Sequence, residues 1–310
     1  MSSLYLDKAC EKQSVGPLAL GSFDGVHLGH SALLEKAVEI AKTARSKSSV
    51  LTFSPNPKEF FSTPQKPYSQ IYSFEQNVEE IKNAGVDEVF IKKFDEDCSK
   101  MTADEFLNFV FFKVKFSDLV VGFDFKFGKD RSGNHQNLKK WCDKNEVKLH
   151  IVKAQKDSVG KISSTRIKKK LLKGDIEKAS KLLGRPHRYL GRICSDQGLG
   201  KKIGFPTLNI KLDLSTAIAY GVYASLIKSG KRHYRGISNI GLRPTVFKSA
   251  ANLVLETHVL GSNNVLIKAG DLVEIELHNF IRSEKKFANI EQLKLQISQD
   301  IATAKSLARF

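Results

Sequence analysis

Apolar and polar positions along the first 185 residues alternate between strand-like and helix-like segments. An apolar run at 17–23 is followed by apolar residues at 33, 34, 37, 38, 41 and 44, the spacing of one helix face. A second β-rich run at 49–53 predicts a βαβ unit with two parallel strands over residues 18–57. The alternation continues with helices expected near 73–84 and from Thr102, and strands at 88–91, 118–123 and 147–152. Five strands with intervening helices predict a doubly wound, Rossmann-like α/β domain, whose ligands bind beyond the carboxyl ends of the strands.

The pattern changes after about residue 186, where short apolar runs separated by glycine-rich turns replace the helices. The runs are clearest at 189–193, 221–227, 253–260 and 272–277. This spacing is typical of an all-β domain and predicts a small antiparallel β-barrel. One apolar stripe on a C-terminal helix is predicted by Ile290, Leu293, Ile297, Ile301 and Ala304. Because Gly184-Arg-Pro186 stops the preceding helical stretch, we place two domains at 1–185 and 186–310.

The composition agrees with a two-domain globular protein. A chain of 310 residues, 41% of them hydrophobic, is long enough for two cores of ordinary size. No apolar run approaches the roughly 20 residues of a spanning helix, and the amino terminus lacks the apolar segment of a secretory signal. We therefore expect a cytoplasmic protein with no membrane partner. Cys10, Cys98, Cys142 and Cys194 have no paired spacing, so all four are expected to be free thiols.

The formal charge of +17 is concentrated in the middle of the chain. Residues 1–150 hold 21 Lys and Arg against 21 Asp and Glu, whereas residues 151–250 hold 22 against 5. Such a block attracts polyanions: nucleic acid, a membrane surface or the phosphates of a small nucleotide. It is equally typical of a solvated lysine-rich face. A nucleic-acid-binding segment is expected to carry aromatic residues among its lysines, and residues 153–188 contain none. We therefore disfavour a nucleic-acid partner.

A first candidate site spans Gly21 to His30, where the first strand becomes the first helix. Glycines in this segment let a ligand approach the backbone, and the N–H groups and dipole of a helix start favour an anion. His27 and His30 are three residues apart and are expected to point the same way, as donors to a phosphoryl oxygen in a transition state. The alternative is structural, with His27 capping the helix and His30 packed. The phosphate-binding candidates in this segment are Gly21, Phe23, Asp24, Gly25 and Gly29.

A phosphate site on this scaffold needs a further cation, and Ser163-Ser164-Thr165-Arg166 offers one. The segment is a hydroxyl-rich helix start followed by an arginine and then by lysines 168–170. Taken alone, the pattern is expected of any capped helix with a solvated lysine face. Combined with the histidine motif, it predicts that Ser163, Ser164 and Thr165 bind phosphate.

A second candidate site lies in the β half, where twelve residues combine three glycines, two lysines, a hydroxyl and an amide. Glycines free the backbone to wrap phosphates, lysines supply charge, and Thr and Asn oxygens suit Mg²⁺. The spacing matches neither a Walker loop nor a dinucleotide fingerprint, and a flexible basic hairpin loop is the alternative. The candidates are Gly198, Gly200, Lys201, Gly204, Thr207 and Asn209, the last two as metal ligands.

With these motifs, the chain resembles the bacterial bifunctional riboflavin kinase/FAD synthetases. Four separated motifs of the adenylyltransferase module correspond to residues 21–30, 52–57, 122–128 and 163–167. The resemblance to the kinase module covers nearly all of residues 184–302, and Gly204-Phe-Pro-Thr-Leu-Asn209 is its most specific element. The resemblance implies that residues 1–185 form an FMN adenylyltransferase domain and residues 186–310 a riboflavin kinase domain, with Mg²⁺ and ATP, and with flavins as substrates and products.

The resemblance also implies roles for the residues of the first domain. His27 and His30 would stabilise the pentavalent phosphorus as the FMN phosphate attacks ATP, and Arg166 would neutralise the departing pyrophosphate. Asp124 and Phe125 would line a pocket for flavin or adenine. Asn56 stands where the family commonly has His; an amide can donate a hydrogen bond but cannot carry charge, so we expect adenylyl transfer to be mildly affected.

In the second domain, the resemblance implies that Thr207 and Asn209 hold Mg²⁺ and the nucleotide phosphates. Glu256 would be the base that takes the proton of the ribityl hydroxyl. A strand glutamate facing water is the alternative for Glu256. Arg282 would contact flavin or phosphate, or pair with Glu284 or another nearby acid. A kinase whose first domain is impaired remains the second functional hypothesis, and the sequence gives no oligomeric state.

Overall fold

The structure is a computed structural model that describes residues 3–6, 13–194, 203–244, 251–261 and 265–307. Internal packing divides the chain into an α/β unit, Met1–Ser164, and a β unit, Thr165–Phe310. By this packing, two helices, α7 (Ser164–Leu171) and α8 (Ile176–Leu183), belong with the β unit. For example, the Leu171 carbonyl accepts a hydrogen bond from Ala219 N at 2.9 Å. The domain boundary expected at 185/186 stays a prediction.

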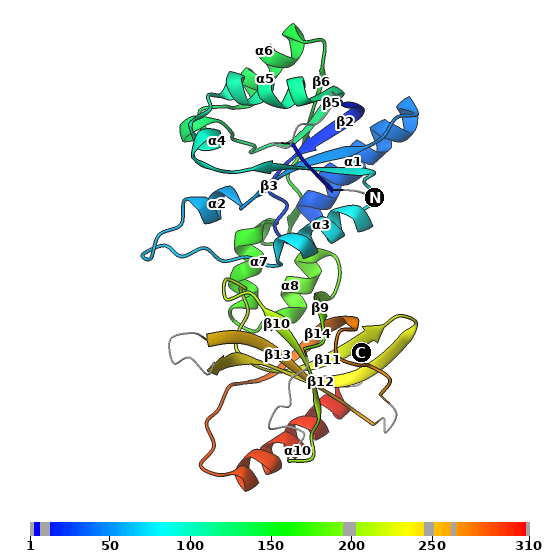
Figure 1. Cartoon of the computed structure of the whole chain (residues 1–310), viewed down its shortest axis with the longest axis vertical. Coiled ribbons are helices and arrows are strands. Elements are labelled where there is room, and N and C mark those ends of the chain that lie inside the picture. Colours follow the sequence, from blue (N-terminus) through cyan, green and yellow to red (C-terminus); the bar gives the residue numbers. More distant parts are fainter. Residues whose placement is uncertain (1–2, 7–12, 195–202, 245–250, 262–264, 308–310) are drawn as a thin grey trace. The chain divides into compact units, whose positions relative to one another are not determined.

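The α/β unit is built on a six-stranded sheet in which every strand pair is parallel (Figure 1). Its strand order is β1 (Ser3–Tyr5), β4 (Glu88–Lys93), β3 (Ser49–Ser54), β2 (Gln13–Leu20), β5 (Val114–Gly122) and β6 (Lys148–Val152). The five predicted strands are present, and β1 adds an edge strand that the apolar pattern did not predict. The doubly wound fold class is confirmed.

Helices cover both faces of this sheet because alternate strand residues point to opposite sides. On one face, α1 (Leu28–Ala44) and α3 (Phe74–Asn83) pack on Ala19, Val50 and Val120. On the other, α5 (Ala103–Lys113) and α6 (His135–Lys144) pack on Leu18, Leu20 and Leu119. The shorter helices are α2 (Pro57–Phe60), α4 (Glu96–Lys100) and a 3₁₀ turn at Lys129–Arg131, and a hairpin of β7 (Lys156–Asp157) and β8 (Gly160–Lys161) precedes α7.

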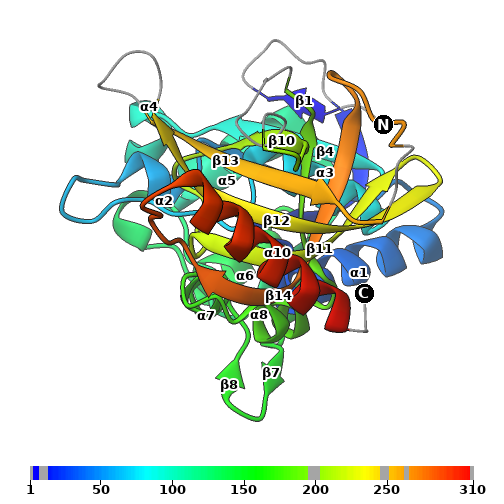
Figure 2. The ribbon, with the colours of Figure 1, turned by 90° about the horizontal axis from the view of Figure 1, so that it is seen from below.

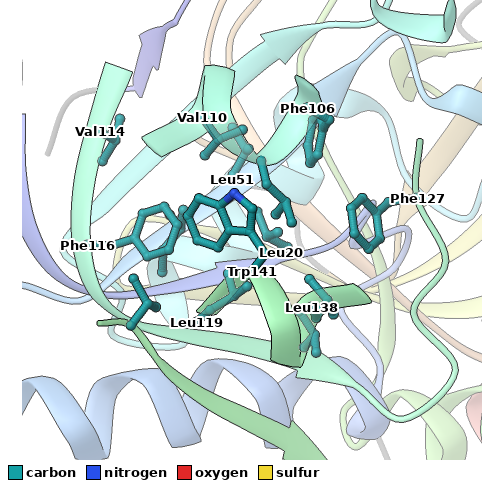
Figure 3. Close-up of a cluster of buried hydrophobic side chains, with 14 of the residues drawn as sticks. Leu20, Leu51, Phe106, Val110, Val114, Phe116, Leu119, Phe127, Leu138 and Trp141 are labelled. Carbon is teal, nitrogen blue, oxygen red and sulfur yellow. The ribbon is translucent and has the colours of Figure 1, made fainter. Parts of the chain in front are cut away.

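Trp141 lies at the centre of the larger core (Figure 3). Its ring stacks on Phe116 at 6.1 Å between centroids, and its indole N–H donates to Asn108 Oδ1 at 2.8 Å. A buried indole that also satisfies its N–H stabilises the packing of α5 and α6 on the sheet. This core fixes strands β2, β3 and β5, whose carboxyl ends carry the first candidate site.

The strand order creates the crevice expected of this fold. From β2 the chain moves to β3 and β4 on one side of the sheet, and β5 and β6 lie on the other side. Ligands of open α/β sheets bind where the order reverses, beyond the carboxyl ends of the strands. That point lies between β2, which is followed by residues 21–30, and β5, which is followed by residues 123–128.

The β unit is a curled six-stranded antiparallel sheet (Figure 1). Its strand order is β10 (Thr207–Leu212), β13 (Ala251–Val259), β12 (Arg232–Pro244), β11 (Gly221–Ser229), β14 (Leu272–Ser283) and β9 (His187–Arg192). Cys194, just after β9, donates its N–H to the Asn209 carbonyl on β10 at 2.8 Å, which links the two edges into a barrel. The predicted small barrel is confirmed.

The predicted C-terminal helix is α10 (Ile290–Ser306), which lies across β11, β12 and β14 (Figure 2). Ala304 is fully buried against Val222, Ala224 and Ile237, whereas Ile290 is exposed. The apolar stripe therefore makes its tightest contact near the end of the helix.

Two further sequence expectations concern cysteines and membranes. Cys98, Cys142 and Cys194 are free thiols, and Cys10 lies outside the described residues. Burial raises the pKa of Cys142 to about 11, so this thiol is unreactive. Within the described ranges, no helix has the length and apolar character needed to cross a membrane.

His187 at the start of β9 makes the stability of the β unit depend on pH. The residue is fully buried and its ring packs edge-on against Tyr189 at 4.9 Å. Burial, with a smaller effect of the Arg185 charge, lowers the pKa of His187 from 6.5 to about 3. The unfolded chain therefore binds more protons at this position below pH 6.5, and the stability present above that pH is lost as the pH falls toward 3.

We predict that His187→Gln reduces the pH dependence of the free energy of unfolding between pH 6.5 and 5 by about 1 kcal/mol per pH unit. The measurement is urea unfolding across this range for the wild type and the variant. Exposed His233→Gln is the control and should keep the wild-type slope. Equal slopes for His187→Gln and wild type would contradict the prediction.

Candidate active sites

The turn after β2 is held in an unusual backbone conformation by the segment that leads into α3. Phe23 and Val26 have positive φ angles of 45° and 37°, and Gly25 has a φ of 83°. Asp24 Oδ1 accepts a hydrogen bond from Ile71 N at 2.9 Å, and Gly25 N donates to Asn77 Oδ1 at 2.7 Å. These two bonds fix a turn that non-glycine residues rarely adopt, and such strained turns cluster at functional sites.

The two histidines of the first motif meet at the start of α1. Their rings stack with 3.8 Å between centroids and 14° between planes, so the expectation that they point the same way is confirmed. His27 is the N-cap of α1, and its Nδ1 accepts from His30 N at 3.3 Å. The structural alternative, a capping His27, is therefore also present. A capped helix start with two imidazoles remains suited to an anion.

Two glycines of the motif keep this corner open. A Cβ on Gly29 would lie 3.0 Å from His27 Cε1, and a Cβ on Gly21 would lie 3.0 Å from the Phe23 ring. Phe23 in turn packs edge-on against His30 at 5.3 Å. Gly21 thus leaves room for the Phe23 ring, which packs on His30, and Gly29 leaves room for the His27 ring.

The serine motif contacts the same turn. Ser164 Oγ donates to the Asp24 carbonyl at 3.0 Å, across 140 residues of sequence. This bond brings the end of the α/β unit, with Ser163, beside the histidine motif. Thr165 and Arg166 follow in the first turn of α7 and belong to the β unit. Their roles in phosphate binding stay predictions.

The candidate flavin residues lie at the ends of β3 and β5. Asn56 caps α2, and its Oδ1 accepts from Lys58 N at 3.0 Å. Asp124 forms an ion pair with Lys161, whose ammonium lies 4.9 Å from the Phe123 ring centroid. Phe125 stacks on Phe127 at 5.4 Å. The arrangement offers aromatic faces and a charged pair beside the crevice, and the flavin contacts themselves stay predictions.

Asn77 and Lys161 were missed by the sequence analysis. Asn77 Oδ1 binds Gly25 and its Nδ2 donates to the Tyr72 carbonyl at 3.1 Å, so one amide ties the turn to α3. No local signal marks it, because an Asn within a helix is ordinarily exposed. Lys161 lies 37 residues from Asp124.

The second site lies on neighbouring strands of the barrel. Asn209 on β10 and Asn239 on β12 are both directly opposite Glu256 on β13, and Thr207 is opposite His258. Directly opposed residues share a face of the sheet, so the two candidate metal ligands and the candidate base lie on one side. Gly204 precedes β10 with a φ of 93°, while Gly198, Gly200 and Lys201 lie outside the described residues.

Asn209 is suited to hold a cation. Its side chain is 2% exposed, and its Oδ1 has no hydrogen-bond partner among the described residues. A buried amide oxygen without a partner is costly, and Mg²⁺ prefers oxygen ligands. The described part of the chain contains no group of three or more His, Cys, Asp or Glu able to hold a metal.

Glu256 is half-buried and forms an ion pair with Arg243 of β12. A second carboxylate, Glu284, lies against Gly241 of the same strand, where any Cβ would clash with it. Burial raises the pKa of Glu284; the Glu256 charge adds to the rise and Arg282 opposes it. The sequence analysis gave Arg243 no role, and it named Glu284 only as a possible partner of Arg282.

Arg282 binds an acid of the C-terminal helix. Its Nε lies 2.9 Å from Asp300 Oδ1 and its Nη2 lies 2.7 Å from Oδ2, while Nη1 donates to the Ser283 carbonyl. Asp300 is 3% exposed and also accepts from Gln296. Of the alternatives left open for Arg282, the pairing with an acid is the one present, and a flavin contact stays a prediction.

We predict that Arg282→Met lowers the free energy of unfolding by about 3–5 kcal/mol, because it leaves the Asp300 carboxylate buried without its partner. Urea unfolding measures this loss. The control is Lys294→Met, which removes an exposed ion pair with Glu291 on the same helix and should cost at most about 1 kcal/mol. An equal loss of stability in the two variants would show that the Arg282–Asp300 pair does not hold α10 on the sheet.

Comparison with known proteins matches two families to successive parts of the chain. The FAD synthetase family matches residues 9–166, and the riboflavin kinase family matches residues 183–308. A crystal structure described as a macrolide-efflux protein from Streptococcus pneumoniae aligns over 99% of both chains with a TM-score of 0.82 and 28% identity.

Relatives in other bacteria match over almost the whole chain. The bifunctional riboflavin kinase/FMN adenylyltransferase of Buchnera aphidicola is 35% identical over 292 residues, which covers 93% of this chain and 92% of the relative. The Escherichia coli enzyme of the same name is 35% identical over 294 residues, 93% of this chain and 91% of the relative. With both family matches on one chain, the protein belongs to the bifunctional riboflavin kinase/FMN adenylyltransferase family.

Proposed function

We propose that the chain carries out two consecutive reactions of flavin cofactor synthesis. The β unit phosphorylates riboflavin with ATP to give FMN, and the α/β unit adenylylates FMN with a second ATP to give FAD and pyrophosphate. The observation that carries the proposal is that one chain holds both the stacked His27–His30 pair at a helix start and the Asn209–Glu256 pair on adjacent strands.

In the adenylyl transfer, a phosphate oxygen of FMN attacks the α-phosphorus of ATP, and the bond from that phosphorus to pyrophosphate breaks. His27 and His30 donate hydrogen bonds to the oxygens on which charge builds in the transition state. The dipole at the start of α1 adds to this stabilisation. Arg166 neutralises the leaving pyrophosphate, and Asn56, Asp124 and Phe125 orient the flavin.

In the kinase reaction, Glu256 takes the proton of the ribityl 5′-hydroxyl as that oxygen attacks the γ-phosphorus of ATP, and ADP leaves. Positioning of the hydroxyl and the phosphates accounts for most of the catalysis in such transfers. Thr207 and the glycines before β10 would hold the phosphates near Glu256. The proton taken up by Glu256 is released to solvent after FMN leaves.

Mg²⁺ that accompanies ATP would be held by Asn209 Oδ1 and the Thr207 hydroxyl. When bound, it neutralises charge on the phosphates and orients them for in-line transfer. The buried Asn209 Oδ1, which has no partner among the residues described, supports this assignment. A cytoplasmic location, small-molecule substrates only and no nucleic-acid partner complete the proposal.

The alternative of a kinase with an impaired first domain rests on Asn56, which stands where the family commonly has His. Asn56 Oδ1 accepts the Lys58 N–H as a helix cap, and an amide fills this structural role without an imidazole. The intact histidine turn favours the bifunctional enzyme over this alternative, and the match to two flavin families favours it over nucleic-acid binding.

Chromatography of the flavins after incubation of the purified protein with ATP and Mg²⁺, and with riboflavin or FMN, tests the function. FAD from both substrates is the expected result. FMN that accumulates without FAD would leave a kinase alone. No conversion of either flavin would overturn the proposal.

We predict that Glu256→Gln lowers FMN formation from riboflavin at least about 100-fold, because it removes the general base. FAD formation from supplied FMN should be unchanged, since the two sites use different residues. Glu274→Gln, on the same sheet and paired with Lys228 at 3.0 Å, is the matched control. Loss of both activities in a folded Glu256→Gln variant would contradict the separation of the sites.

We predict the opposite result for His30→Ala. FAD formation should fall about 100-fold, because a donor to the transition state is lost, while FMN formation continues at the wild-type rate. His150→Ala is the control within the α/β unit, since His150 is bonded to Asp118 at 2.7 Å and lies in the middle of the edge strand β6. Unchanged FAD formation in His30→Ala would reject the role of the first motif.

A further inference from the structure

The turn that carries the histidine motif depends on groups from other elements. Phe23 and Val26 both carry side chains and have φ angles of 45° and 37°. Residues other than glycine rarely adopt such angles, and they do so only where the surrounding structure holds them. The hydrogen bond inside the turn, from Val26 N to the Phe23 carbonyl, is long at 3.4 Å. Contacts from outside the turn therefore help to keep it in this conformation.

The start of α3 supplies two of these contacts. Ile71 N, which precedes the helix, donates to Asp24 Oδ1 at 2.9 Å, and Asn77 Oδ1, in the helix, accepts from Gly25 N at 2.7 Å. Asp24 and Gly25 are adjacent in the sequence. The turn is thus bound at two successive residues by groups on both sides of the helix start.

The Asn77 amide is itself held in one orientation. Its Nδ2 donates to the Tyr72 carbonyl at 3.1 Å, and its backbone N–H donates to the Ser73 carbonyl at 2.9 Å. Tyr72 is fully buried, so its carbonyl is a fixed acceptor. Because one end of the amide is bound there, the other end, Oδ1, is directed at Gly25. One side chain therefore links α3, the segment before it and the turn.

Gly25 lies directly against the same segment. Its φ is 83°, and a Cβ on Gly25 would lie 2.6 Å from Ile71 Cδ1 and 3.2 Å from Ile71 Cβ. Ile71 is fully buried and cannot move aside. Packing against Ile71 therefore prevents Gly25 from moving toward the segment, and the hydrogen bond to Asn77 opposes movement away from it.

The position of Gly25 is passed on to the two imidazoles. Val26 alone separates Gly25 from His27, and its side chain is buried in the core to which Val78 of α3 also belongs. His27 is 5% exposed, caps α1 and stacks on His30 with 3.8 Å between centroids. A rotation of the Gly25 peptide would displace the His27 ring, and the stacked His30 ring would have to follow.

We propose that Asn77 is a positioning residue for adenylyl transfer. Its hydrogen bond holds the Gly25 peptide, and so fixes the direction from which His27 and His30 donate to the reacting phosphate. Asn77 needs no contact with either substrate in this role. The inference rests on the proposed role of the histidine pair in FAD formation.

The test is steady-state FAD formation from FMN and Mg-ATP by the full chain. In Asn77→Ala, kcat should fall about 10-fold, because a small displacement of groups that act in the transition state is costly. The KM values for FMN and ATP should stay within about 2-fold of wild type, since Asn77 touches neither substrate.

A second readout separates positioning from an independent effect of Asn77. On a His30→Ala background, Asn77→Ala should lower kcat by only about 3-fold or less, because one of the two groups through which it acts is already gone. An undiminished loss on this background would show that Asn77 does not act through the pair, and it would overturn the proposal.

Asn83→Ala is the matched control, because Asn83 is an exposed asparagine at the last position of the same helix. It should keep the wild-type kcat. Trp141 is the single tryptophan of the chain and lies in the core of the α/β unit, so its fluorescence without flavin reports whether this unit is folded. If Asn77→Ala does not fold, Asn77→Leu replaces it, since Leu keeps most of the volume and removes both side-chain hydrogen bonds.

The outcomes distinguish this proposal from the function on which it rests. A wild-type kcat in the folded Asn77 variant, or a loss confined to KM, would show that Asn77 does not position the pair, while a large loss in His30→Ala would leave the histidine motif in its role. If His30→Ala makes FAD at the wild-type rate, the histidine motif is not the adenylyl-transfer site, and the proposal for Asn77 falls with it.

Discussion

The hydrogen-bonded register between neighbouring strands is the constraint on which both sites depend. In the barrel, pairing of β13 with β10 and β12 sets Glu256 opposite Asn209 and Asn239. A slip of one residue would turn Glu256 to the other face of the sheet, because side chains alternate with a period of two. In the α/β unit, parallel pairing of β2 with β5 brings the turn after each strand to the same edge. No side chain in either site could compensate for a change in these pairings.

Glycines adapt the sites to this framework. Gly25 takes a backbone conformation that places its N–H on Asn77, and Gly29 leaves room for the His27 ring. Gly241 leaves room for the Glu284 carboxylate on the barrel. In each case the missing side chain allows a polar or ionisable group to lie against the backbone, where its orientation is fixed by packing rather than by its own rotamer preference.

Two arginines of the barrel pair with acids that differ in burial. Arg282 donates hydrogen bonds from Nε and Nη2 to both carboxylate oxygens of a buried aspartate of α10, so its first role is to hold the helix on the sheet. Arg243 pairs with Glu256, the half-buried glutamate proposed as the base. A guanidinium beside a deeply buried acid mainly avoids the cost of leaving that acid charged and without a partner.

The sequence by itself determined the fold class, the family and the segments that carry the chemistry. Periodicity distinguished the parallel α/β half from the antiparallel half because local side-chain patterns reflect which face of an element is buried. The motifs at 21–30 and 204–209 predicted both candidate sites because glycines, histidines and hydroxyls there are local in sequence. The partners of these residues were decided only by the tertiary structure. Asn77, Lys161, Asp300 and Arg243 lie between 13 and 52 residues from the groups they bind, and nothing in their own neighbourhoods marks them. Strand β1 was also missed, because three residues at a sheet edge are too few to show a period.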